Sequence, residues 1–139
     1  MDIYADNILD HYKRPRGKDE SLCVNEQRSC HSEKNPSCGD SLIMELEIDN
    51  GIVKIKWNGS GCAISQAAIS LLSEEIEGKT EEEILKLNKK DIIKMLGVPI
   101  STSRIKCALL CLHTIKNTIK KSKGEVLNKW EDTLEIDHE

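Results

Sequence analysis

The chain has 139 residues with two Trp, two Tyr and no Phe, so a hydrophobic core must be built mainly from aliphatic side chains. This length is enough for one domain. The net charge of −4 arises from mixed acidic and basic residues, which excludes the basic stripe with interleaved aromatics of nucleic-acid-binding proteins. No apolar run reaches membrane-spanning length, and the start of the chain, with Asp2 and Asp6, is unlike a secretory signal. We therefore expect a cytoplasmic protein without a membrane segment, in which six cysteines indicate metal or sulfur chemistry before disulfides.

The first part of the chain predicts one helix and then a loop. Residues 1–12 carry apolar side chains at helical spacing, and Pro15 and Gly17 end the pattern. The basic stretch 11–16 is either a docking surface or a solvated helix end. Residues 17–37 are polar and show no periodicity, so we predict a loop there.

The clearest structural signal is the period-two alternation of residues 41–58, which predicts two strands. Asn50-Gly51 divides them and suits a two-residue type I′ turn, because both positions need positive φ. With that turn, Asp49 faces Ile52 and the rest of the register follows. It forms charge pairs on one face and apolar pairs on the other: Glu47–Lys54, Glu45–Lys56, Ile48–Val53, Leu46–Ile55 and Met44–Trp57.

The open end of this hairpin gathers potential metal ligands. Extending the register places Asp40 opposite Gly61, and Cys38 and Cys62 then lie beside it. Apolar residues at helical spacing after Cys62 predict a helix down to Gly78, which puts Cys62 at a helix N-terminus, where a thiolate is stabilised. Gly59 and Gly61 allow the backbone to approach closely or to take unusual φ. Two thiols and a carboxylate therefore meet at one place.

Capping signals locate the remaining helices. Thr80 and Glu83 form a capping box for a helix through Leu87, and Asn88 can cap another that ends at Gly97 and Pro99. A long helix begins near Ser101 or Ser103, with Cys107 in its first turn. The tail after it is charged, with one further helical turn around Val126, Leu127 and Trp130.

Cys38, Asp40, Cys62 and Cys107 all lie at element starts or in glycine-flanked loops. Three thiolates favour zinc or an iron–sulfur cluster over hard cations. A carboxylate binds iron less firmly than sulfur does, so a cluster held in this way could be built and then released. Such behaviour is typical of a scaffold, whereas electron carriers usually keep four strong ligands.

Three motifs resemble the signatures of the IscU/NifU/SufU family: residues 35–40, 59–67 and 104–108. Residues 10–16 also look like the family's opening, and the resemblance runs from about residue 4 to residue 121. It implies an α+β fold with a small antiparallel sheet, namely the hairpin at about 41–58 plus a third strand, and amphipathic helices packed on one face. It also implies a single domain over residues 1–139, with 1–2 and about 124–139 as tails.

The resemblance implies a scaffold for iron–sulfur cluster assembly rather than an enzyme. A [2Fe–2S] cluster would be built on Cys38, Asp40, Cys62 and Cys107, with Asp40 as the labile ligand. Its partners would be a cysteine desulfurase that delivers persulfide sulfur, an iron or electron donor, and apo iron–sulfur acceptor proteins. A labile site could also be shared or covered in a homodimer. Cys107 would accept the persulfide.

The alternative is a SufU-type, zinc-dependent sulfurtransferase that holds a zinc ion on the same four groups. Its persulfide acceptor would be Cys38. IscU-type members have a His directly before the third cysteine, where this chain has Lys106, and the sequence 104–107 looks like SufU instead. However, the stretch between Cys62 and Cys107 leaves little room for the SufU insertion. Residues 97–100 replace the IscU segment that a dedicated chaperone binds.

Three auxiliary residues flank the third motif. Arg104 and Lys106 either lower thiol pKa values and hold a persulfide anion, or form a basic first turn facing solvent; both interpretations remain open. Cys111, one turn after Cys107, could add a further sulfur, but a small core residue is the favoured interpretation.

Several other residues receive mainly structural interpretations. Cys23 and Cys30 are interpreted as ordinary loop thiols, ahead of a second metal site with His31 or a lid over the cluster. We expect His11, His113 and His138 at the surface. The C-terminal lysines are expected on a solvated helix end: Lys116, Lys120, Lys121 and Lys123.

Overall fold

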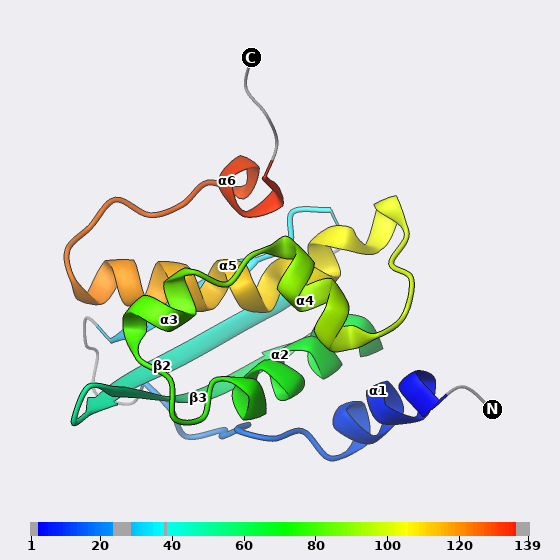
Figure 1. Ribbon diagram of the computed structural model, residues 1–139, viewed down its shortest axis with the longest axis horizontal. Helices are drawn as coiled ribbons and strands as arrows, with labels where there is room; N and C mark the ends of the chain where they lie inside the picture. Colours follow the sequence, from blue (N-terminus) through cyan, green and yellow to red (C-terminus); the bar gives the residue numbers. More distant parts are fainter. Residues whose placement is uncertain (1–2, 24–28, 38, 136–139) are drawn as a thin grey trace.

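The computed structural model describes residues 3–23, 29–37 and 39–135 and shows an α+β architecture. An antiparallel sheet has the strand order β1-β2-β3, with β1 at Cys30–Lys34, β2 at Ser41–Asp49 and β3 at Ile52–Ser60. The long helices lie on one side of this sheet, as Figure 1 shows. The expected fold class, a small sheet with helices on one face, is confirmed.

The β2–β3 hairpin has the predicted register. Asp49 pairs with Ile52, Glu47 with Lys54 and Met44 with Trp57. Asn50 and Gly51 take φ of 52° and 80°, the positive values that a type I′ turn requires. Alternation along β2 sends Leu42, Met44 and Leu46 into the core and leaves the charged residues on the opposite face.

Strand β1 lies inside residues 17–37, so the prediction of a loop across that whole range was wrong. Its residues pair antiparallel with β2, from Cys30 opposite Glu45 to Lys34 opposite Ser41. The expected third strand therefore exists. Hydropathy periodicity does not reveal it, because the inward-facing residues, His31 and Glu33, are polar where a buried strand usually has apolar side chains. Hydrogen bonds satisfy these polar groups inside the protein.

The helices begin where the capping residues predict. Thr80 with Glu83 and Asn88 with Asp91 form complete capping boxes, and Gly97 ends its helix with φ of 71°. A 3-10 turn at Thr102–Arg104 leads into the longest helix. The six α-helices of the described residues are α1 Ile3–Lys13, α2 Ala63–Glu75, α3 Glu81–Leu85, α4 Lys89–Leu96, α5 Ile105–Ser122 and α6 Trp130–Leu134.

The core lies between the sheet and the pair α2 and α5. It is mostly aliphatic and includes Trp57, whose side chain is completely buried and donates from Nε1 to the Arg16 carbonyl oxygen at 2.7 Å. Helix α1 packs on the outer side of α2. This arrangement holds the N-termini of α2 and α5 against the end of the hairpin.

The expectation that His11 and His113 lie at the surface was wrong. His11 is buried, with its ring 2.7 Å from Ser70 Oγ and 3.2 Å from the Glu74 carboxylate, and burial lowers its pKa. His113 is buried under α6. In both cases hydrogen bonds satisfy the ring inside the protein. His138 lies outside the described residues.

The segment after α5 returns along that helix. Asn128 N donates to Asn117 Oδ1 at 2.7 Å, and the Trp130 ring stacks on His113 with 4.1 Å between centroids. The predicted extra turn begins only at Trp130, while Val126 and Leu127 remain outside it and exposed. Specific side-chain contacts therefore fix this part of the chain.

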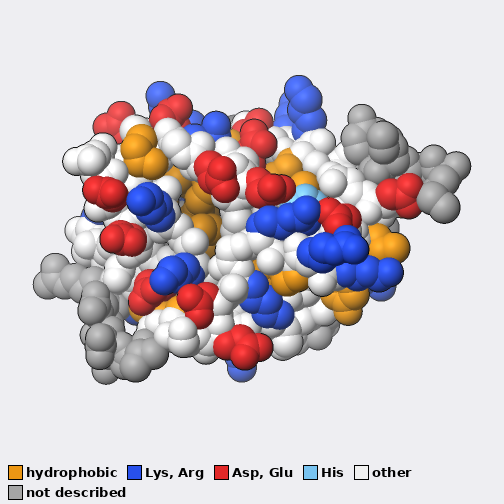
Figure 2. Space-filling model, turned by 90° about the horizontal axis from the view of Figure 1, so that it is seen from below, with side chains coloured by type: hydrophobic (Ala, Val, Ile, Leu, Met, Phe, Trp, Pro, Cys, Tyr) orange, Lys and Arg blue, Asp and Glu red, His pale blue; other side chains and the backbone are white. Residues whose placement is uncertain are grey.

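The face in Figure 2 carries interspersed acidic and basic side chains with scattered hydrophobic ones. This mixture agrees with the sequence-based exclusion of a continuous basic stripe on that face. Among the described residues, no helix combines the length and apolar character needed to span a membrane.

Candidate metal centre

Three segments distant in sequence meet at the open end of the hairpin. They contribute the carboxylate of Asp40, the thiol of Cys62 and the thiol of Cys107, and one ligand atom from each lies within 4.8 Å of the others. Asp40 and Cys107 are buried, and Cys62 is half-buried. The structure therefore brings together three of the four residues that the sequence singled out.

A tight turn presents Asp40. Asn35 N donates to the Asp40 carbonyl oxygen at 2.8 Å, and Gly39 N donates to the Asn35 carbonyl oxygen at 3.0 Å. The side chain of Asn35 reinforces the turn, because its Oδ1 accepts a bond from Ser37 N at 2.9 Å, a typical Asx turn. Hydrogen bonds thereby hold Asp40 beside Asn35, the residue that follows β1.

Cys62 occupies the N-cap position of α2, as predicted. Its backbone is extended, with φ of −72° and ψ of 169°, and its thiol makes no capping bond. The Asp40 carboxylate instead accepts a bond from Cys62 N at 3.2 Å, which places negative charge at the positive end of the helix. The Cys62 thiol lies 3.9 Å from Asp40 Oδ2 and from Ser65 Oγ. It is therefore directed toward the site.

Gly61 is required for this close approach. A Cβ atom at Gly61 would lie 2.7 Å from Asp40 Oδ1 and 2.5 Å from Ser65 Oγ, closer than real Cβ contacts. At Gly59 a Cβ would collide with the carbonyl oxygen of Ser41. The prediction that these glycines permit close backbone approach is confirmed, and neither of them needs positive φ.

Cys107 enters the site from the first turn of α5. Its side chain is 2 % exposed, and Asn35 Nδ2 donates to its sulfur at 3.4 Å. Asn35 therefore serves both as the organiser of the Asp40 turn and as a donor to the third ligand. A hydrogen-bond donor at a sulfur stabilises its anionic form.

The two basic residues of the third motif stand at the start of α5, just before Cys107 in the chain. Arg104, at the N-cap of α5, is exposed, and Lys106 is half-exposed. Their positions are compatible with both interpretations of the sequence. A role toward a sulfur anion remains a prediction.

Cys111 lies in the hydrophobic core rather than at the site. It is completely buried and donates to the Ala108 carbonyl oxygen at 3.5 Å. Burial raises the pKa of the Cys111 thiol to about 12, which opposes the thiolate that a metal needs. The position agrees with the favoured interpretation as a core residue.

The remaining three cysteines differ from one another in what the structure shows of them. Cys38 lies outside the described residues, so its assignment as a ligand and persulfide acceptor stays a prediction. The interpretation of Cys23 and Cys30 as ordinary loop thiols was wrong, because the two form a disulfide with 5.9 Å between Cα atoms. Since His31 instead contacts Glu33 at 2.7 Å, a metal site with His31 is not what the structure shows.

Sequence reasoning missed two residues beside the ligands. Asn35 and Ser65 both stand inside the motifs, yet neither received a role. An Asn followed by Pro is a signal for an Asx turn, and this signal could have identified Asn35. Ser65 Oγ donates to the Cys62 carbonyl oxygen at 3.0 Å, a local bond that a Ser three residues into a helix commonly makes.

The chain is similar to known proteins over most of its length. Residues 3–129 match the family model described as NifU-like N terminal domain. The zinc-dependent sulfurtransferase SufU of Bacillus subtilis is 32% identical, over 88% of this chain and 92% of that protein. The iron–sulfur cluster assembly scaffold protein IscU of Thermotoga maritima is 34% identical, over 86% of this chain and 94% of that protein.

A solved structure shows the same fold. The N-terminal part of a NifU-like protein from Brucella abortus aligns with a TM-score of 0.68 and 17% identity, and the alignment covers 89% of this chain and 96% of that one. The three motifs, the α+β fold and the match over most of the sequence lead to one conclusion: the chain belongs to the NifU-like N-terminal domain family.

Proposed function

We propose that the protein is a scaffold on which a [2Fe–2S] cluster is assembled and from which it is passed to apo-proteins. The observation that carries this proposal is the convergence of Asp40, Cys62 and Cys107 within 4.8 Å. The similarity to the Thermotoga IscU scaffold supports it. Cys38, two residues before Asp40, would be the fourth ligand, and we propose that residues 1–139 act as one domain.

The donor set fits a soft metal. A zinc–sulfur bond of about 2.3 Å puts two sulfurs of a tetrahedral site about 3.8 Å apart. The three described ligand atoms would therefore need to approach one another by no more than about 1 Å, which side-chain rotation can supply. Asp40 differs from the sulfur ligands, since its carboxylate already accepts a bond from Cys62 N. It can return to that bond when it leaves a metal, which suits a cargo that must be released.

Sulfur would arrive as a persulfide on a cysteine desulfurase. The thiolate of Cys107 attacks the terminal sulfur, the sulfur–sulfur bond of the donor breaks, and its electron pair leaves on the desulfurase thiolate. The donor hydrogen bond from Asn35 Nδ2 would stabilise the sulfur anion at Cys107 before and after this transfer. Arg104 and Lys106, just before Cys107 in the chain, would attract the incoming anion.

We propose that cluster assembly takes place in the cytoplasm, because a reducing compartment keeps thiolate ligands available. The other participants would be an iron or electron donor and apo-protein acceptors. A homodimer that covers the half-buried Cys62 would protect the cargo from solvent.

A second candidate function is zinc-dependent sulfur transfer. The 32% identity with the Bacillus sulfurtransferase favours it, together with a Lys rather than a His directly before Cys107. In this case zinc occupies the same ligands, and Cys38 accepts the persulfide after leaving the metal. Residues of the described site serve both functions, so metal content must decide between them.

The deciding experiment is anaerobic purification followed by iron, zinc and acid-labile sulfide analysis with a visible spectrum. The same measurements follow the addition of a desulfurase, cysteine and ferrous iron. About two irons and two sulfides per site, with sulfur-to-iron charge-transfer absorption, are expected for a scaffold. Tightly held zinc, no cluster after reconstitution and a stimulated desulfurase would reject the scaffold in favour of sulfur transfer. Zinc that gives way to a cluster would show that zinc is a resting occupant.

A further inference from the structure

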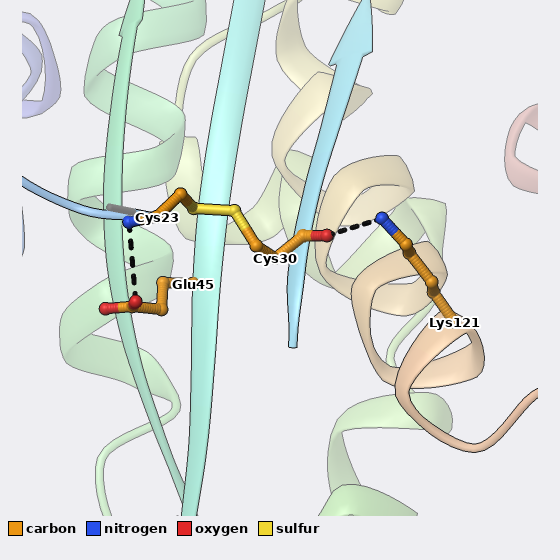
Figure 3. Close-up of a disulfide and its surroundings, with 4 residues drawn as sticks. All are labelled: Cys23, Cys30, Glu45 and Lys121. Atoms are coloured by element: carbon orange, nitrogen blue, oxygen red, sulfur yellow. Dashed lines mark hydrogen bonds between the residues drawn. A yellow bond between two sulfur atoms is a disulfide. The ribbon is translucent and has the colours of Figure 1, made fainter. Parts of the chain in front are cut away.

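The Cys23–Cys30 disulfide lies on the opposite side of the sheet from the helices. Cys30 pairs with Glu45 in the β1–β2 register, so its side chain shares the charged outer face with that residue. Cys23 N donates to Glu45 Oε1 at 3.4 Å. Figure 3 shows the two sulfurs crossing β2 between these points. The disulfide therefore spans the central strand on its outer face.

The disulfide joins the two sides of the sheet. The segment leading to Cys23 runs along β3, where Lys18 bridges to Trp57 and Asp19 N donates to the Trp57 carbonyl oxygen at 2.8 Å. On the other side, Cys30 begins the edge strand β1. Opening the disulfide would separate these attachments without breaking a strand pair of the β2–β3 hairpin.

Several features make this pair accessible to exchange. Both cysteines are half-exposed, so an attacking thiolate can reach a sulfur. A sequence separation of seven closes only a short loop, and short loops gain the least from a disulfide. The same molecule also carries Cys62 as a thiol. A compartment reducing enough to keep that thiol also contains reductants that can attack an accessible disulfide.

We propose that Cys23 and Cys30 form a thiol–disulfide exchange site that a dithiol reductant opens. This site is separate from the metal centre and does not depend on the proposed function. One thiolate of the reductant attacks Cys23 Sγ, the sulfur–sulfur bond breaks, and its electron pair leaves on Cys30 Sγ. The second thiol of the reductant then displaces Cys23. Two electrons and two protons end on the cysteines, and the reductant leaves as a disulfide.

Lys121 lies on the Cys30 side of the disulfide. Its Nζ donates to the Cys30 carbonyl oxygen at 2.7 Å, whereas the Glu45 carboxylate is bonded to the backbone of Cys23 (Figure 3). A nearby cation stabilises a thiolate and a nearby carboxylate opposes it. Glu45 lies beside both cysteines, because it pairs with Cys30 and accepts a bond from Cys23 N, so Lys121 is what distinguishes them. We therefore assign Cys30 as the leaving thiolate and Cys23 as the carrier of the transient mixed disulfide.

The test counts thiols in the full chain prepared without metal. The protein is incubated with dithiothreitol or with mixtures of reduced and oxidised glutathione, quenched with an alkylating reagent and weighed by mass spectrometry. We expect two additional alkylated cysteines, mapped to Cys23 and Cys30, to appear together as the mixture becomes more reducing. The double variant Cys23→Ser/Cys30→Ser should lose this transition, and Cys111→Ala should keep it.

A second measurement tests the leaving group. Lys121→Ala should slow opening by dithiothreitol several-fold, while Lys120→Ala, on the same turn, should leave the rate unchanged. Hydrogen exchange on the reduced protein should increase in β1 more than in α2.

The proposal is overturned if both cysteines are alkylated before any reductant is added, or if the disulfide survives every native reducing mixture and opens only in denaturant. Equal rates in the two lysine variants would overturn the assignment of Cys30 as the leaving sulfur. None of these outcomes depends on metal binding.

Discussion

Helix α5 carries two polar clusters that differ in their bonding. At its N-terminus, the sulfur contacts of the metal centre are long, at 3.4 Å to Cys107 and 3.9 Å to Cys62. Further along, the Glu33 cluster, which we define as His31, Glu33, His113 and Asn117, contains bonds of 2.7 and 2.8 Å to the Glu33 carboxylate. The metal centre connects α5 to the turn between β1 and β2, and the Glu33 cluster connects α5 to β1 itself.

This difference in bonding indicates the role of each cluster. Sulfur is a weak hydrogen-bonding atom, so its contacts can be exchanged for a metal at small cost. A carboxylate with several short bonds has its capacity filled by the protein itself. Burial alone would raise the pKa of Glu33, but hydrogen bonds from His113, His31 and Asn117 outweigh it and hold the pKa well below its usual value. The Glu33 cluster is therefore structural, and the metal centre is available for chemistry.

The largest expected effect separates two cysteines of the same helix. Cys107→Ser should abolish cluster assembly, since it removes a sulfur ligand, whereas Cys111→Ala should retain it because Cys111 is buried in the core. Iron and sulfide content after reconstitution provides the measurement. Cys23→Ser should also retain assembly. Assembly lost in Cys111→Ala with an unchanged fold would contradict this division of the cysteines.

Removing the centre of the Glu33 cluster should cost stability without affecting metal binding. Glu33→Ala leaves half-buried His31 and buried His113 and Asn117 without their shared acceptor. We expect it to lower the free energy of unfolding by about 3 kcal/mol. Urea denaturation measures this loss. The matched variant Glu47→Ala, on the exposed outer face of the sheet, should change stability by less than about 0.5 kcal/mol.

The same carboxylate predicts a pH dependence. Because the folded pKa of Glu33 lies below its unfolded value, its stabilisation is complete above the unfolded pKa of about 4.3 and is lost as pH falls toward the folded pKa. Between pH 5 and pH 3 we expect this group to remove about 1–2 kcal/mol of stability. Urea titrations at several pH values should show a shallower dependence in Glu33→Gln. An identical slope in both proteins would rule out this carboxylate as its source.

Asn35→Asp tests the donor at the third ligand. It keeps the Oδ1 acceptor for Ser37 N but replaces the donor to Cys107 with a negative charge. We expect cluster assembly to slow by about tenfold, since a carboxylate opposes a sulfur anion at close range. Circular dichroism should show an unchanged fold. A normal assembly rate would show that the bond to Cys107 has no role in the chemistry.

The smallest expected effect is on release. Asp40→Ala removes the labile ligand, so a cluster held by the cysteines should transfer to an apo-ferredoxin several-fold more slowly. Transfer is followed by the absorbance or circular dichroism of the acceptor. An unchanged transfer rate would count against the labile-ligand role of Asp40. It would also remove the proposed difference between the exchangeable carboxylate of Asp40 and the structural carboxylate of Glu33.

Local chemistry made much of the fold predictable from sequence. The Asn50-Gly51 turn determined the hairpin register, and with it the meeting of Asp40 and Gly61. A shift of the register by one residue would turn the apolar side chains of a strand to the solvent face. Capping boxes at Thr80 and Asn88 marked two helix starts. These signals act over a few residues, so no tertiary information is needed to interpret them.

The missed features share a physical cause. Strand β1 and the burial of His113 depend on polar side chains that satisfy one another across distant segments, such as the bond from Asn117 to Glu33. Patterns of hydropathy assign such residues to the surface. The Cys23–Cys30 disulfide likewise depends on the crossing of the sheet, which the spacing of two cysteines does not reveal.

The two tryptophans occupy environments that make them separate optical reporters. Trp57 is fully buried between the sheet and the helices, so its emission changes only when the core opens. Trp130 is half-exposed and stacked on His113, so its emission changes when the C-terminal segment leaves α5. With Trp57→Phe and Trp130→Phe variants, fluorescence can therefore time the detachment of the tail separately from global unfolding, without an added label.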